Sequence, residues 1–281
     1  MIGDELLVVR DLTVEFPRKG IGHKPFRALE NVSIDVRAGE TVGLVGESGS
    51  GKSTLGRAVL GLAPVSGGSI RFRGKDIAHL NRPKRRELSS DLQVVFQDPY
   101  TSLNPSLTIE QILSEPLTAA DIPADEARRT LRQLLDQVGM PSNTLDRLPR
   151  EFSGGQRQRI AIARALALSP QLIVCDEPVS ALDLSTQARV LELFKDVQEQ
   201  TGVAYLFISH DLNVVRYLSH RVAVMYRGEI VEDGAASVVT QNPRHPYTQR
   251  LLAASPVADP RRQAERREAR HRMMLLESRR A

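Results

Sequence analysis

The chain is 281 residues long, is 41% apolar and carries a formal net charge of +4. This length is sufficient for one large α/β domain, or two smaller ones, with a packed core. No apolar run approaches the ~20 residues that span a bilayer, and the first residues lack the blocks of a signal peptide, so we expect a soluble, cytoplasmic chain. The single cysteine, Cys175, excludes an intrachain disulfide and any all-cysteine metal cluster.

In chain order, alternating strands and helices predict a mainly parallel α/β sheet. Residues 7–16 and 32–36 alternate apolar and polar side chains, as half-buried strands do. Residues 41–45 form a further predicted strand, which leads through a glycine-rich loop into a predicted helix over 53–62. Another strand is predicted over 92–96.

The stretch from about 98 to 168 changes character. Prolines separate helical patterns such as the one over 125–138, and no convincing strand lies between them, which predicts an inserted helical subdomain. The sheet resumes with continuous apolar runs at 172–175 and 205–209, typical of strands covered on both faces. A hairpin is predicted over 222–231.

The glycine-rich loop is predicted to bind phosphate. Its glycines let backbone N–H groups point inward, and the following helix adds its positive N-terminal end, which together form an anion cradle. Lys52 would reach the β- and γ-phosphates of a nucleotide, and Ser53 would place its hydroxyl on Mg²⁺. The predicted ATP-binding residues of this phosphate loop are Gly46, Glu47, Ser48, Gly49, Ser50, Gly51, Lys52, Ser53 and Thr54.

Two adjacent acids, Asp176 and Glu177, follow the predicted strand at 172–175. Ligand-binding carboxylates in open α/β sheets lie at this end of a strand. Asp176 would hold Mg²⁺ directly or through water, and Glu177 would polarise the attacking water as general base. An isolated pair of this kind is more often a loop or helix cap, so the hypothesis depends on the phosphate loop upstream.

A second predicted anion site begins at Ser153, which is a plausible N-cap for the helix that follows. Gly154 and Gly155 would expose N–H groups at the start of that helix. One γ-phosphate cannot easily be held by two helix N-termini far apart on one subunit. The second set of donors therefore does not belong to the same pocket as the phosphate loop.

In this order the motifs resemble the ATP-binding cassette of ABC transporters, over roughly residues 5–258. The resemblance implies a P-loop NTPase (RecA-like) core with an antiparallel β subdomain and the inserted helical subdomain. It also implies that two cassettes close head to tail over two Mg-ATP molecules. Phe152 stands where the family's signature loop usually has leucine. The implied signature residues, which contact ATP bound to the partner, are Ser153, Gly154, Gly155 and Gln156.

The resemblance implies roles for residues that are weak signals by themselves. Gln97 would contact the metal and water and link the pocket to the membrane subunit, and His210 would contact the γ-phosphate and help position Glu177. Phe16 is the implied adenine-stacking residue, and a core phenylalanine is the alternative interpretation. The implied catalytic residues are Glu177, His210, Gln97 and Lys52; the metal ligands are Ser53, Gln97 and Asp176; the D-loop is Ser180, Ala181, Leu182 and Asp183.

Within the family, residues 95–105 and 244–252 resemble the ATPases of oligopeptide, dipeptide and nickel importers, and residues 53–57 are closer to the F-type member. This implies a peripheral ATP-hydrolysing subunit on the cytoplasmic side of the cell membrane. Its implied partners are an identical or unlike second ATPase, two integral membrane permeases and, indirectly, an extracytoplasmic solute-binding protein. Many relatives carry a cysteine-rich segment for an iron–sulfur cluster; this chain has one cysteine, so no cluster is expected.

Two alternatives stay open at this stage: an importer ATPase for nickel or another small solute, and a soluble ABC ATPase without a transport function. Residues 259–281 form a basic tail with eight arginines and four acidic residues. A solvated tail is the favoured interpretation over a patch for anionic lipid. No aromatic residue interleaves the arginines, so we expect no nucleic-acid partner.

Overall fold

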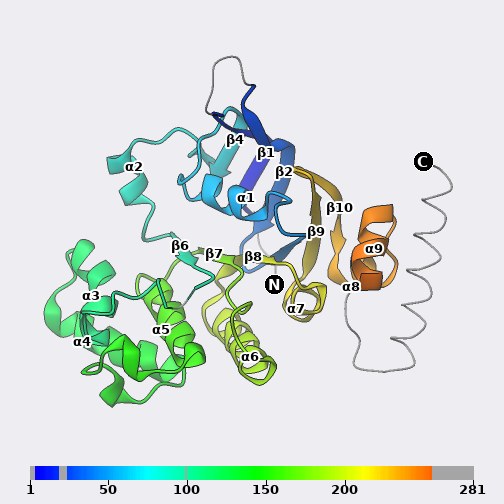
Figure 1. Ribbon diagram of the computed structural model, residues 1–281. Coiled ribbons are helices and arrows are strands. Elements are labelled where there is room, and N and C mark those ends of the chain that lie inside the picture. The colour runs from blue at the N-terminus through cyan, green and yellow to red at the C-terminus, as the bar shows by residue number, and fades with distance from the viewer. Residues whose placement is uncertain (1–3, 19–23, 99, 255–281) are drawn as a thin grey trace.

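The computed structural model describes residues 4–18, 24–98 and 100–254, so the basic tail lies outside the described residues. Figure 1 shows two sheets with helix α1 (Lys52–Val59) between them and a group of helices, drawn in green, beside the larger sheet. The mixed α/β architecture with a separate antiparallel sheet is the fold class that the sequence predicts.

The larger sheet has six strands in the order β10-β9-β3-β8-β7-β6. All neighbouring pairs are parallel except β9 with the edge strand β10. Every residue of β3, β7 and β8 is buried, because helices or the second sheet cover both faces. The strand bounds are β3 Thr41–Val45, β6 Leu92–Val95, β7 Leu172–Asp176, β8 Ala204–Ser209, β9 Arg221–Tyr226 and β10 Glu229–Ala235.

The smaller sheet is antiparallel, in the order β2-β1-β4-β5. Its alternating inner side chains, such as Leu7 and Ile34, form one core with Leu55 of α1 and Val174 of β7. This core holds α1, the helix that follows the phosphate loop, in place between the two sheets. The strand bounds are β1 Glu5–Phe16, β2 Phe26–Arg37, β4 Gly67–Phe72 and β5 Lys75–Asp76.

Among the described residues between β6 and β7, the chain forms helices and turns and no strand. A second core joins these helices to the far face of the large sheet, for example through Leu131, Ile162 and Phe207. The predicted helix over 125–138 is α4. Helix α2 (Arg82–Glu87) precedes β6. The helices between β6 and β7 are α3 Ile109–Ala119, α4 Ala124–Gln137 and α5 Gly154–Leu166, and those after β7 are α6 Leu184–Thr201, α7 Leu212–Leu218, α8 Ala236–Gln241 and α9 Pro246–Ala254.

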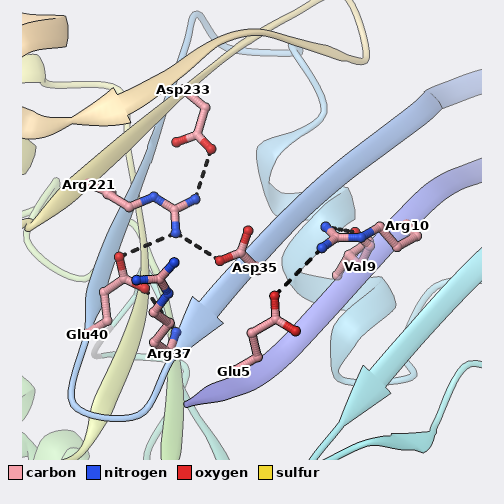
Figure 2. Close-up of polar contacts among 8 residues, drawn as sticks. All are labelled: Glu5, Val9, Arg10, Asp35, Arg37, Glu40, Arg221 and Asp233. Atoms are coloured by element: carbon pink, nitrogen blue, oxygen red, sulfur yellow. Dashed lines mark hydrogen bonds and ion pairs between the residues drawn. The ribbon is translucent and has the colours of Figure 1, made fainter. Parts of the chain in front are cut away.

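Arg221 ties the two sheets together where β3 and β9 begin (Figure 2). Its guanidinium donates to Asp35 of β2 at 2.9 Å and to Asp233 of β10 at 2.8 Å. The same group lies 3.4 Å from the carboxylate of Glu40, which is 1% exposed and also accepts from the Arg37 N–H. Arg221 therefore compensates the buried charge of Glu40. The network lies at the opposite end of the parallel strands from the phosphate loop.

Candidate nucleotide-binding site

The phosphate loop, residues 46–54, connects β3 to α1 and depends on glycine at two positions. Gly46 lies so close to the neighbouring strand β9 that an added Cβ atom would lie 2.2 Å from the Met225 carbonyl oxygen. Gly51 has φ 109°, a conformation that L side chains rarely adopt, and its added Cβ would lie 2.7 Å from Leu29. The sharp curl of the loop therefore requires these glycines.

Lys52 lies inside this curl and is 4% exposed. Its ammonium donates to the carbonyl oxygens of Gly46 at 2.8 Å and Glu47 at 2.9 Å. Burial lowers the pKa of Lys52, and the nearby carboxylates of Glu177 and Asp176 oppose that shift. Lys52 is also the first residue of α1, and the N-terminus of a helix is a site that favours anions such as phosphate.

Two oxygen ligands meet where α1 begins and β7 ends. The Ser53 hydroxyl donates to the Asp176 carboxylate at 2.7 Å, across 123 residues of sequence. Hydroxyl and carboxylate oxygens are the donors that Mg²⁺ prefers. The residues present therefore fit a magnesium ion beside the phosphate loop.

Glu177 follows Asp176 in a strained backbone conformation, with φ 49°. Its N–H donates to the Ile208 carbonyl at 3.0 Å, which holds the residue against β8. Its side chain is 14% exposed, and Oε2 lies 2.9 Å from Nδ1 of His210, the residue that follows β8. Such outliers cluster at functional sites, because the surrounding structure must enforce them.

Glu177 and the phosphate loop border a cleft of about 400 Å³. Gln97 and Glu177 line it together with Lys52 and Ser53 of the phosphate loop. The sequence reasoning missed one aromatic residue of the lining, Phe26, which is 48% exposed.

Phe16, the residue chosen from the sequence for adenine stacking, is not among the residues that line the cleft. It lies directly across the β1–β2 pair from Phe26 and is 36% exposed. Two aromatics at facing strand ends are the signal that could have identified Phe26, but only once the strand register is known.

The signature residues lie elsewhere on the chain and do not line this cleft. Ser153 caps α5: its hydroxyl accepts from the Gln156 N–H at 3.3 Å, and the Gln156 side chain accepts from the Ser153 N–H at 2.9 Å. An added Cβ on Gly155 would lie 2.2 Å from Thr186 of α6, whereas one on Gly154 would have ordinary contacts at 3.5 Å. The α5 N-terminus therefore packs tightly on α6 and leaves Gly154 accessible.

The D-loop, residues 180–183, joins the acid pair to α6. The Ser180 hydroxyl donates to the Glu177 carbonyl at 3.0 Å. Asp183 caps α6 by accepting from the N–H groups of Ser185 and Thr186, and hydrogen bonds to those residues hold the pKa of Asp183 well below its usual value. The loop is thus fixed at both ends.

Two arginines of α5 hold the segment after Gln97. The Arg157 guanidinium lies 4.2 Å from the ring centroid of Tyr100, a cation–π contact. Arg164 donates to the Ser102 carbonyl at 2.6 Å, and burial lowers the pKa of Arg164. This segment and the signature helix therefore form one packed unit.

The fold and the cleft define a P-loop nucleotide-binding domain with an additional antiparallel sheet and a helical segment. The family model described as ABC transporter matches residues 29–180, which is more than half of the chain, so the chain belongs to the ABC transporter family. Glutathione import ATP-binding protein GsiA of Escherichia coli O6:H1 is 52% identical over 270 residues, and that of Shigella flexneri serotype 5b is 51% identical. Each match covers 94% of this chain but only 43% of the relative, so the chain spans less than half the length of these proteins.

Solved structures of similar cassettes have the same fold. The dimeric post-hydrolysis structure of the ATP-binding cassette MJ0796, bound to ADP and Pi, has a TM-score of 0.73 at 28% identity and covers 82% of this chain and 99% of that one. The structure of cbiO1 from Clostridium perfringens, described as part of the ABC transporter complex cbiONQ, has a TM-score of 0.75 at 27% identity over 85% of this chain and 92% of that one.

Proposed function

We propose that the chain is the ATP-binding and ATP-hydrolysing subunit of an ABC importer for oligopeptides or dipeptides. The observation that carries this proposal is a cleft lined by Lys52, Ser53 and Glu177, beside which Ser53 bonds to Asp176 and Glu177 contacts His210. Each supplies one requirement of phosphoryl transfer: charge compensation, metal ligation and a positioned base.

The chemistry follows from these positions. Lys52 compensates the charge of the β- and γ-phosphates, and Mg²⁺, held by Ser53 and Asp176 with Gln97 beside them, would neutralise charge that develops on the phosphate oxygens. Glu177 accepts a proton from the attacking water, while His210 fixes the direction of the Glu177 carboxylate.

We assign the signature residues to the ATP of a second cassette, identical or unlike. They lie outside the cleft of their own chain, and their N–H groups at the α5 N-terminus form an anion site without a phosphate of its own. The dimeric form of the similar cassette MJ0796 supports this assignment.

We assign a groove of about 500 Å³ as the docking site for the membrane permeases. It is lined by parts of α2, β6, α3 and α5, including Arg86, Gln93, Glu115 and Arg164. Gln93 lies four residues before Gln97, so a permease segment in this groove would be connected to the cleft. The described residues contain no helix with the length and apolar composition of a membrane span. Because the relatives are named import ATP-binding proteins, we assign the chain to the cytoplasmic side of the cell membrane as a peripheral subunit.

The proposed solute is a peptide because the relatives are named for the import of glutathione, itself a short peptide. Two permeases and a solute-binding protein complete the proposed importer. The test is co-purification of the full chain with membrane permeases, followed by Mg²⁺-dependent ATP hydrolysis and peptide uptake in reconstituted vesicles. Retention on ribosomes or DNA without a permease would favour a soluble ABC ATPase. Uptake of nickel in place of peptide would show that the proposed solute is wrong.

A further inference from the structure

The phosphate loop rests on the C-terminal part of the chain, outside the stretch that the family model matches. Gly46 packs against the Met225 carbonyl of β9, as described above. In the turn between β9 and β10, the Gly228 N–H donates to the Ser50 carbonyl at 2.9 Å. Two points of the loop are therefore held by backbone contacts with residues nearly 180 positions away.

A third point is held by a side chain. The Glu47 N–H, in the second position of the loop, donates to the hydroxyl of Tyr247 at 2.9 Å. Tyr247 comes from α9 and is 2% exposed. Its ring shares a core with Val45, the last residue before the loop. Burial raises the pKa of Tyr247, so the hydroxyl stays a neutral acceptor across the physiological range.

The position of the Tyr247 hydroxyl is itself fixed from two sides. The ring lies against Tyr226 of β9, with ring centroids 4.2 Å apart. The chain just before α9 is attached to β10, because both carboxylate oxygens of Glu232 accept backbone N–H bonds, from Arg244 at 2.8 Å and from His245 at 3.0 Å. The hydroxyl is therefore presented to the loop by a rigid surface.

We propose that Tyr247 is a positioning residue for nucleotide binding, whose hydroxyl holds the phosphate loop in the conformation that accepts the phosphates. The inference rests on the proposed function, because it requires that the loop bind a nucleotide. A loop that is ordered for only part of the time binds its ligand more weakly by that fraction. Loss of the acceptor leaves the Glu47 N–H without its partner and favours other loop conformations.

The test compares Tyr247→Phe with Tyr226→Phe in the full chain. The first variant keeps the buried ring and removes only the hydroxyl that Glu47 contacts, and the second removes the hydroxyl of its stacking partner as a matched control. Equilibrium titration with Mg-ADP should give a Kd roughly tenfold higher for Tyr247→Phe, the loss expected for one buried hydrogen bond, and an unchanged Kd for the control. In hydrolysis assays KM for ATP should rise while kcat at saturating ATP stays within about twofold, because bound nucleotide orders the loop.

Each outcome is decisive. An unchanged Kd for Tyr247→Phe, with normal binding by the unmodified chain, would overturn the positioning role and leave the proposed function intact. A lowered melting temperature with an unchanged Kd would assign the hydroxyl a structural role only, which also overturns the proposal. If the unmodified chain binds no Mg-ADP, the proposed function itself fails.

Discussion

Nδ1 of His210 lies 2.9 Å from Oε2 of Glu177, although the two residues come from the ends of different strands. The carboxylate is mostly shielded and the imidazole is about half exposed, with side-chain exposures of 14% and 51%. A histidine in this position can orient the carboxylate without excluding a water molecule from its other oxygen. This geometry is compatible with the roles proposed above for Glu177 as the base and His210 as its positioning residue.

Glu177→Gln should keep nucleotide affinity and lower turnover by about 10²- to 10⁴-fold, because the amide preserves shape but cannot accept a proton. The measurement is phosphate release at saturating ATP together with Mg-ADP binding. Glu199→Gln, which changes an exposed residue of α6, is the matched control and should hydrolyse ATP at the normal rate. Normal turnover of Glu177→Gln would exclude Glu177 as the general base.

Lys52→Ala should weaken nucleotide binding by at least about tenfold, because the phosphate charge inside the loop loses its charged hydrogen-bond donor. Lys75→Ala removes an equal charge from the exposed strand β5 and should leave affinity unchanged. Equilibrium titration with Mg-ADP distinguishes the two. An equal, small effect of both variants would mean that overall charge, and not the Lys52 contact, governs binding.

Gly154→Asp should block closure of two cassettes while sparing nucleotide binding to the single chain. Its Cβ fits at ordinary contact distance, and the carboxylate would stand where the partner's γ-phosphate is proposed to arrive. Gly155→Asp is a poorer test, because its Cβ would overlap Thr186 and disturb the packing of α5 on α6. The readout is ATP-dependent dimer formation by size-exclusion chromatography in the Glu177→Gln background, with Gly154→Ala as control.

Mixing Gly154→Asp chains with Lys52→Ala chains tests whether the ATP sites are shared. If two identical cassettes pair head to tail, one site of the mixed dimer carries both defects and the other carries neither. Partial recovery of ATP hydrolysis in the mixture is the expected result for a self-pairing cassette. No recovery, with each variant folded, would indicate an unlike partner cassette or dependence on both sites.

Arg221→Met should lower the free energy of unfolding by on the order of 3 kcal/mol, because it leaves the Glu40 carboxylate buried without its cation. Arg10→Met is the control: its pair with Glu5 is exposed and 3.9 Å long, and its loss should change stability little. Urea denaturation measures both. Because the network lies at the opposite end of the parallel strands from the phosphate loop, the Kd for Mg-ADP should not change in either variant.

The sequence was sufficient to predict where the glycine-rich loop and the strand-end acids lie, because each is a local pattern with a known place in an α/β sheet. It also predicted the inserted helices, from proline spacing and helical periodicity. Two other features depend on contacts between distant parts of the chain. The positions of Phe26 and Tyr247 depend on strand register and on the packing of α9, and they join residues up to 200 positions apart. No local pattern encodes such contacts.

The tight contact between Gly155 and Thr186 was equally invisible in the sequence, because the two glycines of the signature look equivalent there. Only the packing of α5 on α6 distinguishes them. Gly155 is needed for helix packing, whereas a Cβ at Gly154 would make only ordinary contacts. The roles proposed for Gln97 and the signature residues stay predictions that the variants above address.

The left-handed backbone of Glu177 has a consequence for the evolution and engineering of this chain. A glycine at this position would relieve the strain that φ 49° imposes on a residue with a side chain. Selection for thermal stability alone would therefore favour loss of the carboxylate, whereas selection for turnover would retain it. Variants that are selected for stability without an activity screen should therefore be checked first for a substitution of Glu177.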